Sequence, residues 1–301
     1  METACYGILL GMKTLTVTCS DPSDLKDLRK NGADEVILAL QNNVFSALQE
    51  MNQEEILDCC GKAHEEGLKV LLLMNCLYPQ SEIDEAAITM ISLLENGVDS
   101  VIFADPGLLY FAMKKGLENR MIYQPETLIT SSCDASFWMS QNISSAVLSS
   151  LITREEIAEI ARKVKGLTLY VHGRLLMSVS RRKLLKAYKT KADVHFENEY
   201  NRSLTLVEEK RNGRMPVYEN KNACMIFTDY VQESFDEMKD FRINIDRFVI
   251  DGSFLSKQEC MDAAAIYRSI LDGGQPDTDS YRKKYGKENL SDGYYGQKTV
   301  R

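Results

Sequence analysis

The sequence of 301 residues lacks the long apolar runs that would assign it to a membrane. No segment approaches the roughly 20 apolar residues that a spanning helix needs. The first ten residues hold a short apolar run without a basic start, which is unlike a secretory signal. We therefore expect a soluble, cytoplasmic protein with no membrane partner.

Grouped metal ligands and nucleotide motifs are also missing. The eight cysteines form no C-x-x-C pair and no cysteine/histidine run, so neither a disulfide framework nor a metal site is indicated. No G-x-G-x-x-G or G-x-x-x-x-G-K follows an apolar run, which removes motif support for a nucleotide-binding fold. H-E-x-x-H and a nucleophile elbow are absent as well, so no standard protease signature is present.

Positive charge is in the minority, with 36 basic against 44 acidic residues and a formal net charge of -8. Such a balance argues against binding nucleic acid through the overall field, so any RNA contact needs a local patch. The stretch 180–191 concentrates six basic residues and a tyrosine. It suits phosphates or an RNA backbone, although a solvated helix face is the alternative. The candidate nucleic-acid-binding residues are Arg181, Arg182, Lys183 and Lys186.

What the sequence does contain is a repeated rhythm of short apolar runs and amphipathic segments, typical of β-α units around a parallel sheet. Asn31 to Leu38 is echoed by Asn96 to Phe103, so a helix stop, a turn and a strand are encoded twice. About eight strands favour a closed barrel over an open sheet. The expected strands are 14–19, 35–40, 69–74, 100–104, 121–124, 146–148, 167–171 and 247–250.

We therefore predict an α/β fold, a (β/α)8 TIM-type barrel over residues 1–270. The rhythm fails at about 178–222, which predicts an irregular basic insertion after the seventh strand. Residues 271–301 are rich in Gly, Asp, Lys and Tyr, and we expect a short helix and a loose tail there.

Polar residues that follow the strands are the candidates for chemistry, because the C-terminal strand ends of such barrels surround one mouth. A pocket of carboxylates and amides with one histidine and one arginine would grip an anionic substrate and move a proton. For Asp105 and Asp251 the alternative is ordinary turn and cap chemistry. The candidates are Glu126, His172 and Asp251 as catalytic residues, and Asn75, Asp105 and Arg174 as substrate-binding residues.

The segment from Tyr170 to Arg182, with His172-Gly173 followed by Ser-x-Ser-Arg-Arg, resembles the signature of peptidase family U32, the collagenase-like proteases. Phe45-Ser46-Ala47, Asn75, Asp105-Pro106, Glu126-Thr127 and Asp251-Gly252 fall in that family's order. The resemblance covers roughly residues 14–270. It implies a barrel whose larger relatives hold an iron-sulfur cluster through cysteines near the positions of Met177 and Leu184.

Neither of those two positions is cysteine here, so we expect no cofactor in this chain. A further departure is Leu48, where relatives tend to have arginine. The chain instead resembles the short bacterial subtype encoded beside a cluster-bearing paralogue. That resemblance implies a cluster-free subunit in prephenate-dependent hydroxylation of tRNA uridine to 5-hydroxyuridine. Its partners would be tRNA, the paralogue and a small anionic metabolite such as prephenate. A protease and a noncatalytic barrel scaffold are the alternatives.

Overall fold

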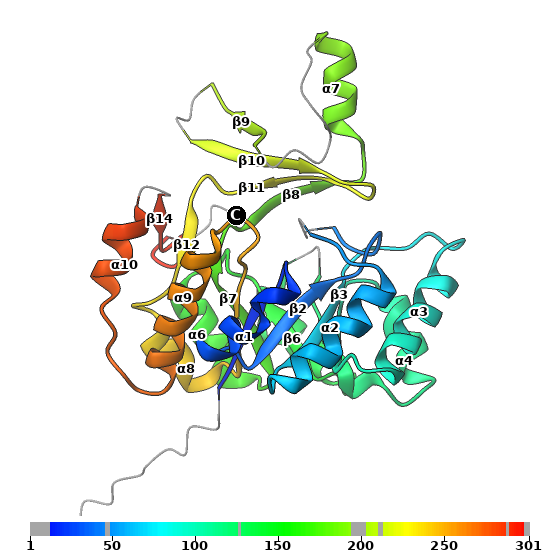
Figure 1. Cartoon of the computed structure of the whole chain (residues 1–301), viewed down its shortest axis with the longest axis horizontal. Helices are drawn as coiled ribbons and strands as arrows, with labels where there is room; N and C mark the ends of the chain where they lie inside the picture. Colours follow the sequence, from blue (N-terminus) through cyan, green and yellow to red (C-terminus); the bar gives the residue numbers. More distant parts are fainter. Residues whose placement is uncertain are drawn as a thin grey trace, which may run out of the picture.

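A closed barrel of eight parallel strands forms the centre of the computed structural model (Figure 1). The structure describes residues 13–45, 49–125, 128–193, 203–209, 213–286 and 289–297. Neighbouring strands pair in chain order, and the last strand pairs with both the first and the seventh, which closes the barrel. The strands are β1 (Thr14–Thr18), β2 (Glu35–Ala39), β3 (Lys69–Met74), β4 (Ser100–Phe103), β5 (Met121–Tyr123), β6 (Ser145–Leu148), β7 (Leu167–Gly173) and β13 (Arg247–Ile250).

This topology confirms the predicted (β/α)8 TIM-type barrel. Each strand coincides with an expected apolar run, because a parallel strand covered on both faces needs apolar residues almost throughout. The burial of β2 illustrates the point, since all five of its residues are buried.

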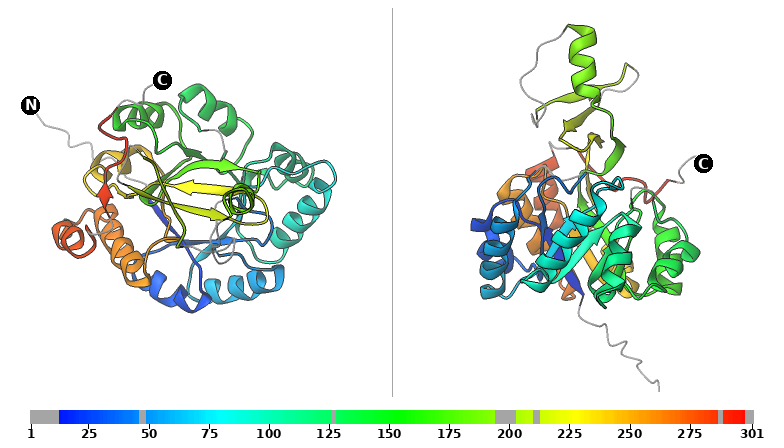
Figure 2. Two further views of the ribbon diagram at one scale, coloured as in Figure 1. Left: turned by 90° about the horizontal axis from the view of Figure 1, so that it is seen from above. Right: turned by 90° about the vertical axis from the view of Figure 1, so that its right-hand side faces the viewer.

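Helices surround the barrel, as the view from above in Figure 2 makes clear. Capping boxes begin two of them, with Asn52 and Glu55 at α2 and Thr153 and Glu156 at α6. Within the described ranges, no helix is long and apolar enough to cross a membrane. The helices around the barrel are α1 (Leu25–Lys30), α2 (Gln53–Glu65), α3 (Ile83–Glu95), α4 (Pro106–Met113), α5 (Ser132–Met139), α6 (Arg154–Lys163), α8 (Met238–Asn244) and α9 (Lys257–Leu271), with short 3-10 turns at Pro22–Asp24 and Glu118–Arg120.

The barrel interior is layered along its axis. Near the N-terminal ends of the strands, the Arg247 guanidinium donates to the Glu35 carboxylate at 2.7 and 3.3 Å, and the Thr16 hydroxyl donates to the same carboxylate at 2.8 Å. An apolar layer that includes Leu71, Ile102 and Ile122 lies within the barrel. The interior is thus closed below, and open space is left at the C-terminal ends of the strands.

The insertion after β7 forms a four-stranded antiparallel sheet over the barrel mouth (Figures 1 and 2). The sequence predicted an irregular segment, because these strands are short, partly exposed and do not follow the rhythm of the barrel. We call this sheet the roof. Its strands, in spatial order, are β8 (Leu176–Ser180), β11 (Cys224–Phe227), β10 (Arg214–Glu219) and β9 (Thr205–Val207). Helix α7 (Leu184–Ala192) stands on it.

The C-terminal region packs against the barrel wherever the structure describes it. Helix α10 (Thr278–Tyr285) lies against α9, and β14 (Leu290–Ser291) pairs with β12 (Val231–Glu233), which itself runs antiparallel to the end of β7. Tyr281 and Tyr295 are 3% and 2% exposed. The composition of this region predicts a loose tail. Its tyrosines instead bury their rings, and their hydroxyls form hydrogen bonds.

Candidate functional site

A cavity of about 290 Å³ lies between the C-terminal ends of the barrel strands and the roof. Ile37, Leu73 and Val147 give it an apolar floor, and Met177 and Phe227 reach it from the roof. A volume near 300 Å³ is at the lower end for small-molecule sites, and an apolar wall with a few polar groups is their usual composition. The polar and charged lining residues are Thr18, Ser20, Gln49, Asn75, Gln124, Ser149, Ser150, Tyr170, Arg174, Ser178, Asp251 and Ser253.

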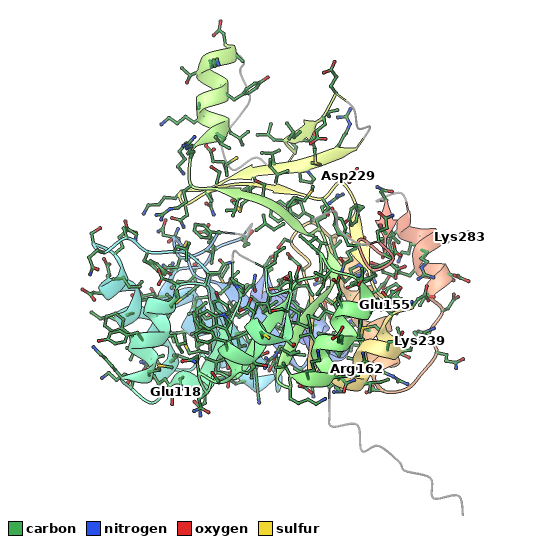
Figure 3. The ribbon with its side chains drawn as sticks, turned by 180° about the vertical axis from the view of Figure 1, so that it is seen from behind. Glu118, Glu155, Arg162, Asp229, Lys239 and Lys283 are labelled. Carbon is green, nitrogen blue, oxygen red and sulfur yellow. The ribbon has the colours of Figure 1, made fainter. Side chains whose placement is uncertain are left out.

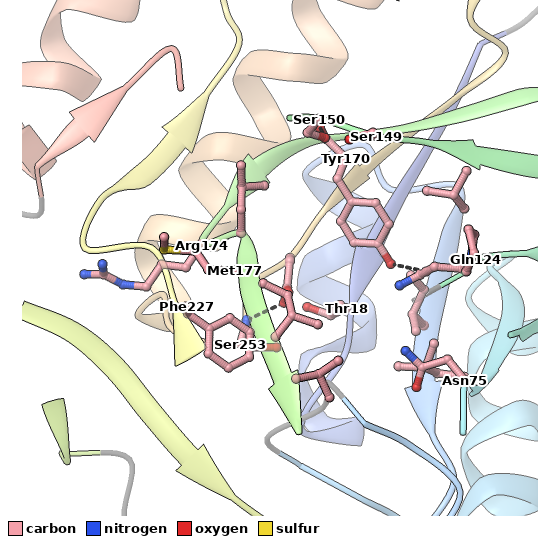
Figure 4. A pocket seen from close by; sticks show the side chains of 18 of the residues that line it. Thr18, Asn75, Gln124, Ser149, Ser150, Tyr170, Arg174, Met177, Phe227 and Ser253 are labelled. Carbon is pink, nitrogen blue, oxygen red and sulfur yellow. Dashed lines mark hydrogen bonds between the residues drawn. The ribbon is translucent and has the colours of Figure 1, made fainter. Parts of the chain in front are cut away.

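Tyr170 and Gln124 form a hydrogen-bonded pair inside this cavity (Figure 4). The Tyr170 hydroxyl donates to the Gln124 side-chain oxygen at 2.9 Å, and the Ser150 hydroxyl donates to the Tyr170 carbonyl oxygen at 2.9 Å. Burial raises the pKa of the Tyr170 phenol, and the nearby Asp251 charge adds to that rise. Tyr170 is therefore a neutral hydrogen-bonding group at physiological pH.

Asn75 enters the cavity from the end of β3, as the sequence predicted for strand-end residues. It is 1% exposed, and its side-chain oxygen accepts a hydrogen bond from the Phe45 amide at 3.0 Å. That bond fixes the orientation of the amide and ties the loop after β2 to the end of β3.

Arg174 also lines the cavity, directly after β7. Among the described lining residues it is the one with a positive charge. Its guanidinium donates to the Thr228 carbonyl oxygen at 2.8 Å, and Figure 4 shows it directed away from Gln124 and Asn75. The positive charge therefore lies at the edge of the cavity, where the barrel meets the roof.

Asp251 lines the cavity at the end of β13, the neighbour of β7, and its carboxylate accepts from the Ser253 amide at 2.9 Å. Burial raises the pKa of this carboxyl group, while the bonds from Ser253 oppose the rise. The Asp251 amide donates to the His172 carbonyl oxygen at 2.8 Å. Gly173 allows this approach, since its φ is +123° and a Cβ there would meet the Asp251 carbonyl oxygen at 2.4 Å.

His172 points away from the cavity and into the layer between the barrel and the C-terminal helices. It is 2% exposed, and its ring nitrogens lie 2.9 Å from the Tyr281 hydroxyl and 3.3 Å from the Tyr267 hydroxyl. Phe235 stacks on its ring. Burial lowers the pKa of the imidazole to about 3, so it is neutral at physiological pH.

A register shift in the pairing of β7 with β13 explains this orientation. Val249 pairs with Tyr170 whereas Ile250 pairs with His172, so Val171 is an extra residue in β7. Such a bulge reverses the alternation of side chains beyond it. Tyr170 therefore faces the barrel interior, whereas His172 faces outward.

Asp105 lies outside the cavity and caps α4. One carboxylate oxygen accepts from the Gly107 amide at 2.7 Å, and the other accepts from the Tyr78 amide at 2.8 Å. Both oxygens thus hold backbone amides, which matches the alternative of cap chemistry. Glu126, the remaining candidate, lies outside the described residues, as do Ser46, Ala47 and Leu48.

The basic candidates are separated from the cavity by the roof. Arg181 and Arg182 are exposed in the turn after β8, and Lys186 is exposed on α7. The Lys183 ammonium group instead donates to the carbonyl oxygens of Asn220 and Lys221, in the turn between β10 and β11. Lys183 therefore fastens the start of α7 to the roof.

The cysteines do not fit the iron-sulfur cluster that the resemblance implies for larger relatives. Met177 and Leu184, at the positions of two cluster cysteines, are exposed apolar residues. In the part of the chain that the structure describes, no three His, Cys, Asp or Glu side chains are gathered as metal ligands. No cluster chemistry is therefore assigned to this chain.

The structure is thus a closed (β/α)8 barrel with a roofed cavity, a candidate small-molecule site, at its C-terminal face. The sequence model of peptidase family U32 matches residues 20–299. The chain belongs to that family. The sequence analysis is confirmed on this point.

Relatives with curated names are tRNA hydroxylation proteins. Protein P2 of Bacillus subtilis (strain 168) is 24% identical over 275 residues, which cover 90% of this chain and 89% of that protein. Protein P of Escherichia coli (strain K12) is 27% identical over 158 residues, or 52% of this chain and 34% of that protein. The structure of the U32 peptidase Mk0906 matches with a TM-score of 0.51 at 15% identity, over 80% of this chain and 92% of that chain, which supports the fold alone.

Proposed function

We propose that this chain is a cluster-free subunit of a system that hydroxylates tRNA uridine to 5-hydroxyuridine. The observation that carries the proposal is its match to tRNA hydroxylation protein P2, which extends over 90% of this chain and 89% of that protein. A match of that extent spans the roof as well as the barrel. The redox centre would come from a cluster-bearing paralogue, because this chain has no cysteines at the two cluster positions.

The role of the barrel in this proposal is to bind a small anionic metabolite such as prephenate. A cavity of about 290 Å³ with an apolar floor suits a ring compound. Arg174 supplies the positive charge at its edge, and Asn75, Tyr170 and Gln124 supply neutral hydrogen-bonding groups. Arginine suits carboxylates because its guanidinium presents several donors in one plane.

The other candidates take different roles. Asp251 holds a proton more readily than an exposed carboxyl group would, since burial raises its pKa, and it lies against the cavity. His172 is a positioning residue, because it is buried behind the strand that carries Tyr170 and Arg174. Glu126 remains a proposed catalytic residue on the resemblance alone.

Proteolysis is not favoured by the described lining of the cavity. Cys19 lines it, but the thiol donates to the Asp21 carbonyl oxygen at 3.2 Å, and its pKa is raised by hydrogen bonding to Cys59 and by burial. A nucleophilic cysteine needs the opposite environment.

The test is deletion of the gene in its host, followed by mass spectrometry of digested tRNA. We expect 5-hydroxyuridine to disappear and to return with the wild-type gene. Arg174→Gln should restore it poorly, whereas Lys26→Gln, an exposed change on α1, should restore it fully. Unchanged 5-hydroxyuridine in a deletion strain without another family member would contradict the proposal.

A further inference from the structure

The turn and helix at residues 181–192, here called the basic arm, are positively charged, whereas the chain as a whole carries a net negative charge. The arm contains six basic residues and no acidic one, in a protein of net charge -8. Six of the 36 basic residues thus lie together without an acidic residue among them. A local basic patch on a chain of net negative charge favours an anionic partner at that patch.

The arm projects from the molecule rather than packing on it. No residue of α7 is buried, and Figures 1 and 2 show the helix standing on the roof with its axis directed away from the barrel. Figure 3 shows its side chains extending into solvent on several sides. Nine residues rise roughly 13 Å at 1.5 Å per residue, so the helix offers its whole length to a partner.

An isolated helix of this length is unstable in water, so the arm depends on its attachment. Glu219, which is fully buried, accepts hydrogen bonds from the amides of Leu185 at 2.9 Å and Lys186 at 3.4 Å. A carboxylate at this end also favours the helix dipole. With the Lys183 anchor, these bonds hold the helix upright at its base. The start of the helix is therefore fixed to the roof, while its outer part is accessible to a partner.

Four other basic side chains of the arm face solvent. Arg181, Arg182, Lys186 and Lys191 are exposed, and none of the ion pairs between described residues includes them. Tyr188, 59% exposed on the same helix, adds an aromatic face. Basic residues with an aromatic ring suit a phosphate backbone with accessible bases.

We propose that the basic arm binds the phosphate backbone of tRNA through Arg181, Arg182, Lys186 and Lys191, with Tyr188 available for stacking on a base. This inference rests on the proposed function, which supplies tRNA as the partner. Lys183 is excluded from the contact because its ammonium group holds the roof turn. An acidic protein partner is the competing occupant.

The experiment measures binding of the full-length protein to an unmodified tRNA transcript by fluorescence anisotropy between 50 and 200 mM salt. The variant is Lys186→Ala with Lys191→Ala. Lys26→Ala with Lys30→Ala is the matched control, because it removes two exposed lysines from α1 at the side of the barrel. Thermal unfolding of all three proteins checks that the fold is kept.

Loss of two phosphate contacts should weaken binding roughly 10- to 50-fold at 0.1 M salt and reduce the salt slope by about 1.4 to 1.8. The control should bind as the wild type does. Equal affinity and slope for the arm variant would overturn the inference, as would a wild-type protein that does not bind the transcript. Retained tRNA binding with lost capture of the paralogue would also overturn it, in favour of a protein partner. The proposed function is judged separately, by 5-hydroxyuridine in the deletion strain.

Discussion

Gly173 is the position where one added methyl group tests how the edge of the cavity is built. At Gly173→Ala, the new Cβ would lie 2.4 Å from the Asp251 carbonyl oxygen and 3.0 Å from the Asp251 Cβ. The first contact, to a backbone atom, is shorter than Cβ atoms tolerate, and the second is tighter than most Cβ contacts. The end of β13 must therefore move away from β7, and Asp251 moves with it.

Two terms set the size of the effect. A positive φ costs an alanine roughly 1–2 kcal/mol, and forcing atoms into a packed site costs about 1–3 kcal/mol more. A total near 3 kcal/mol lowers the Tm by roughly 5 °C for a chain of this length, at about 2.1 cal/mol/K per residue. Gly116→Ala is the matched control, because its φ is +68° and no atom lies within 4 Å of the added Cβ. Gly116→Ala therefore has a positive φ without the overlap.

The assay is thermal unfolding of the wild type and both variants by circular dichroism, with binding of prephenate measured in parallel. We expect the Tm of Gly173→Ala to fall below that of Gly116→Ala by at least roughly 2–5 °C, the share of the overlap, because a φ of +123° also suits alanine less than +68°. It should also bind the metabolite more weakly, because Asp251 and Arg174 are displaced. Equal Tm values for the two variants would refute the argument that Gly173 permits the approach of Asp251.

Two further predictions concern buried polar groups. The unfolded state takes up the His172 proton near pH 6.5, whereas the folded state does so only near pH 3, so stability is lost as the pH falls between these values. Denaturant unfolding should show the wild type losing about 2 kcal/mol more than His172→Phe between pH 6.5 and 5, and parallel losses would contradict this. Arg247→Met leaves the Glu35 carboxylate unpaired inside the barrel and should lower the free energy of unfolding by about 3–5 kcal/mol. Adding Glu35→Gln should restore part of the loss in the same assay, and no recovery would argue against an unpaired charge as the cause.

The barrel was predictable because its code is local. Runs such as the five residues from Val70 to Met74 are continuously apolar, and a helix stop with glycine precedes several of them. The antiparallel roof gave no comparable signal, since β8 and β9 have exposed residues and β10 contains a proline. The pairs β9–β10 and β10–β11 are short hairpins, and only β8–β11 joins distant residues, Ser180 and Cys224. Strands this short give periodicity little to detect.

The candidate site was only partly predictable, for reasons that particular residues make clear. Asn75, Arg174 and Asp251 line the cavity, as expected for residues that follow strands. Tyr170 was missed because it lies within β7 rather than after it. Tyr170 is two residues after Thr168 on the same strand, so both side chains face the barrel interior, and this spacing is a signal that could have identified it. His172 follows the same alternation in sequence, and only the extra residue in the pairing turns it outward.

The roof separates the two proposed ligands. The roof is attached to the barrel on two sides. On one side its chain continues from β7. On the other side, the Asn222 side-chain amide donates to the Val44 carbonyl oxygen at 3.1 Å, and the Asn220 side-chain amide donates to the Glu50 carboxylate at 3.3 Å. The cavity lies beneath this sheet and the basic arm stands above it. Leu128, which lines the cavity and is 48% exposed, marks an approach from the β5 side. A metabolite that enters on this side would not cross the roof, whereas a uridine of a tRNA bound on the arm would have to. If both proposals hold, the uridine reacts on the partner chain, and this subunit supplies the metabolite site and the grip on RNA.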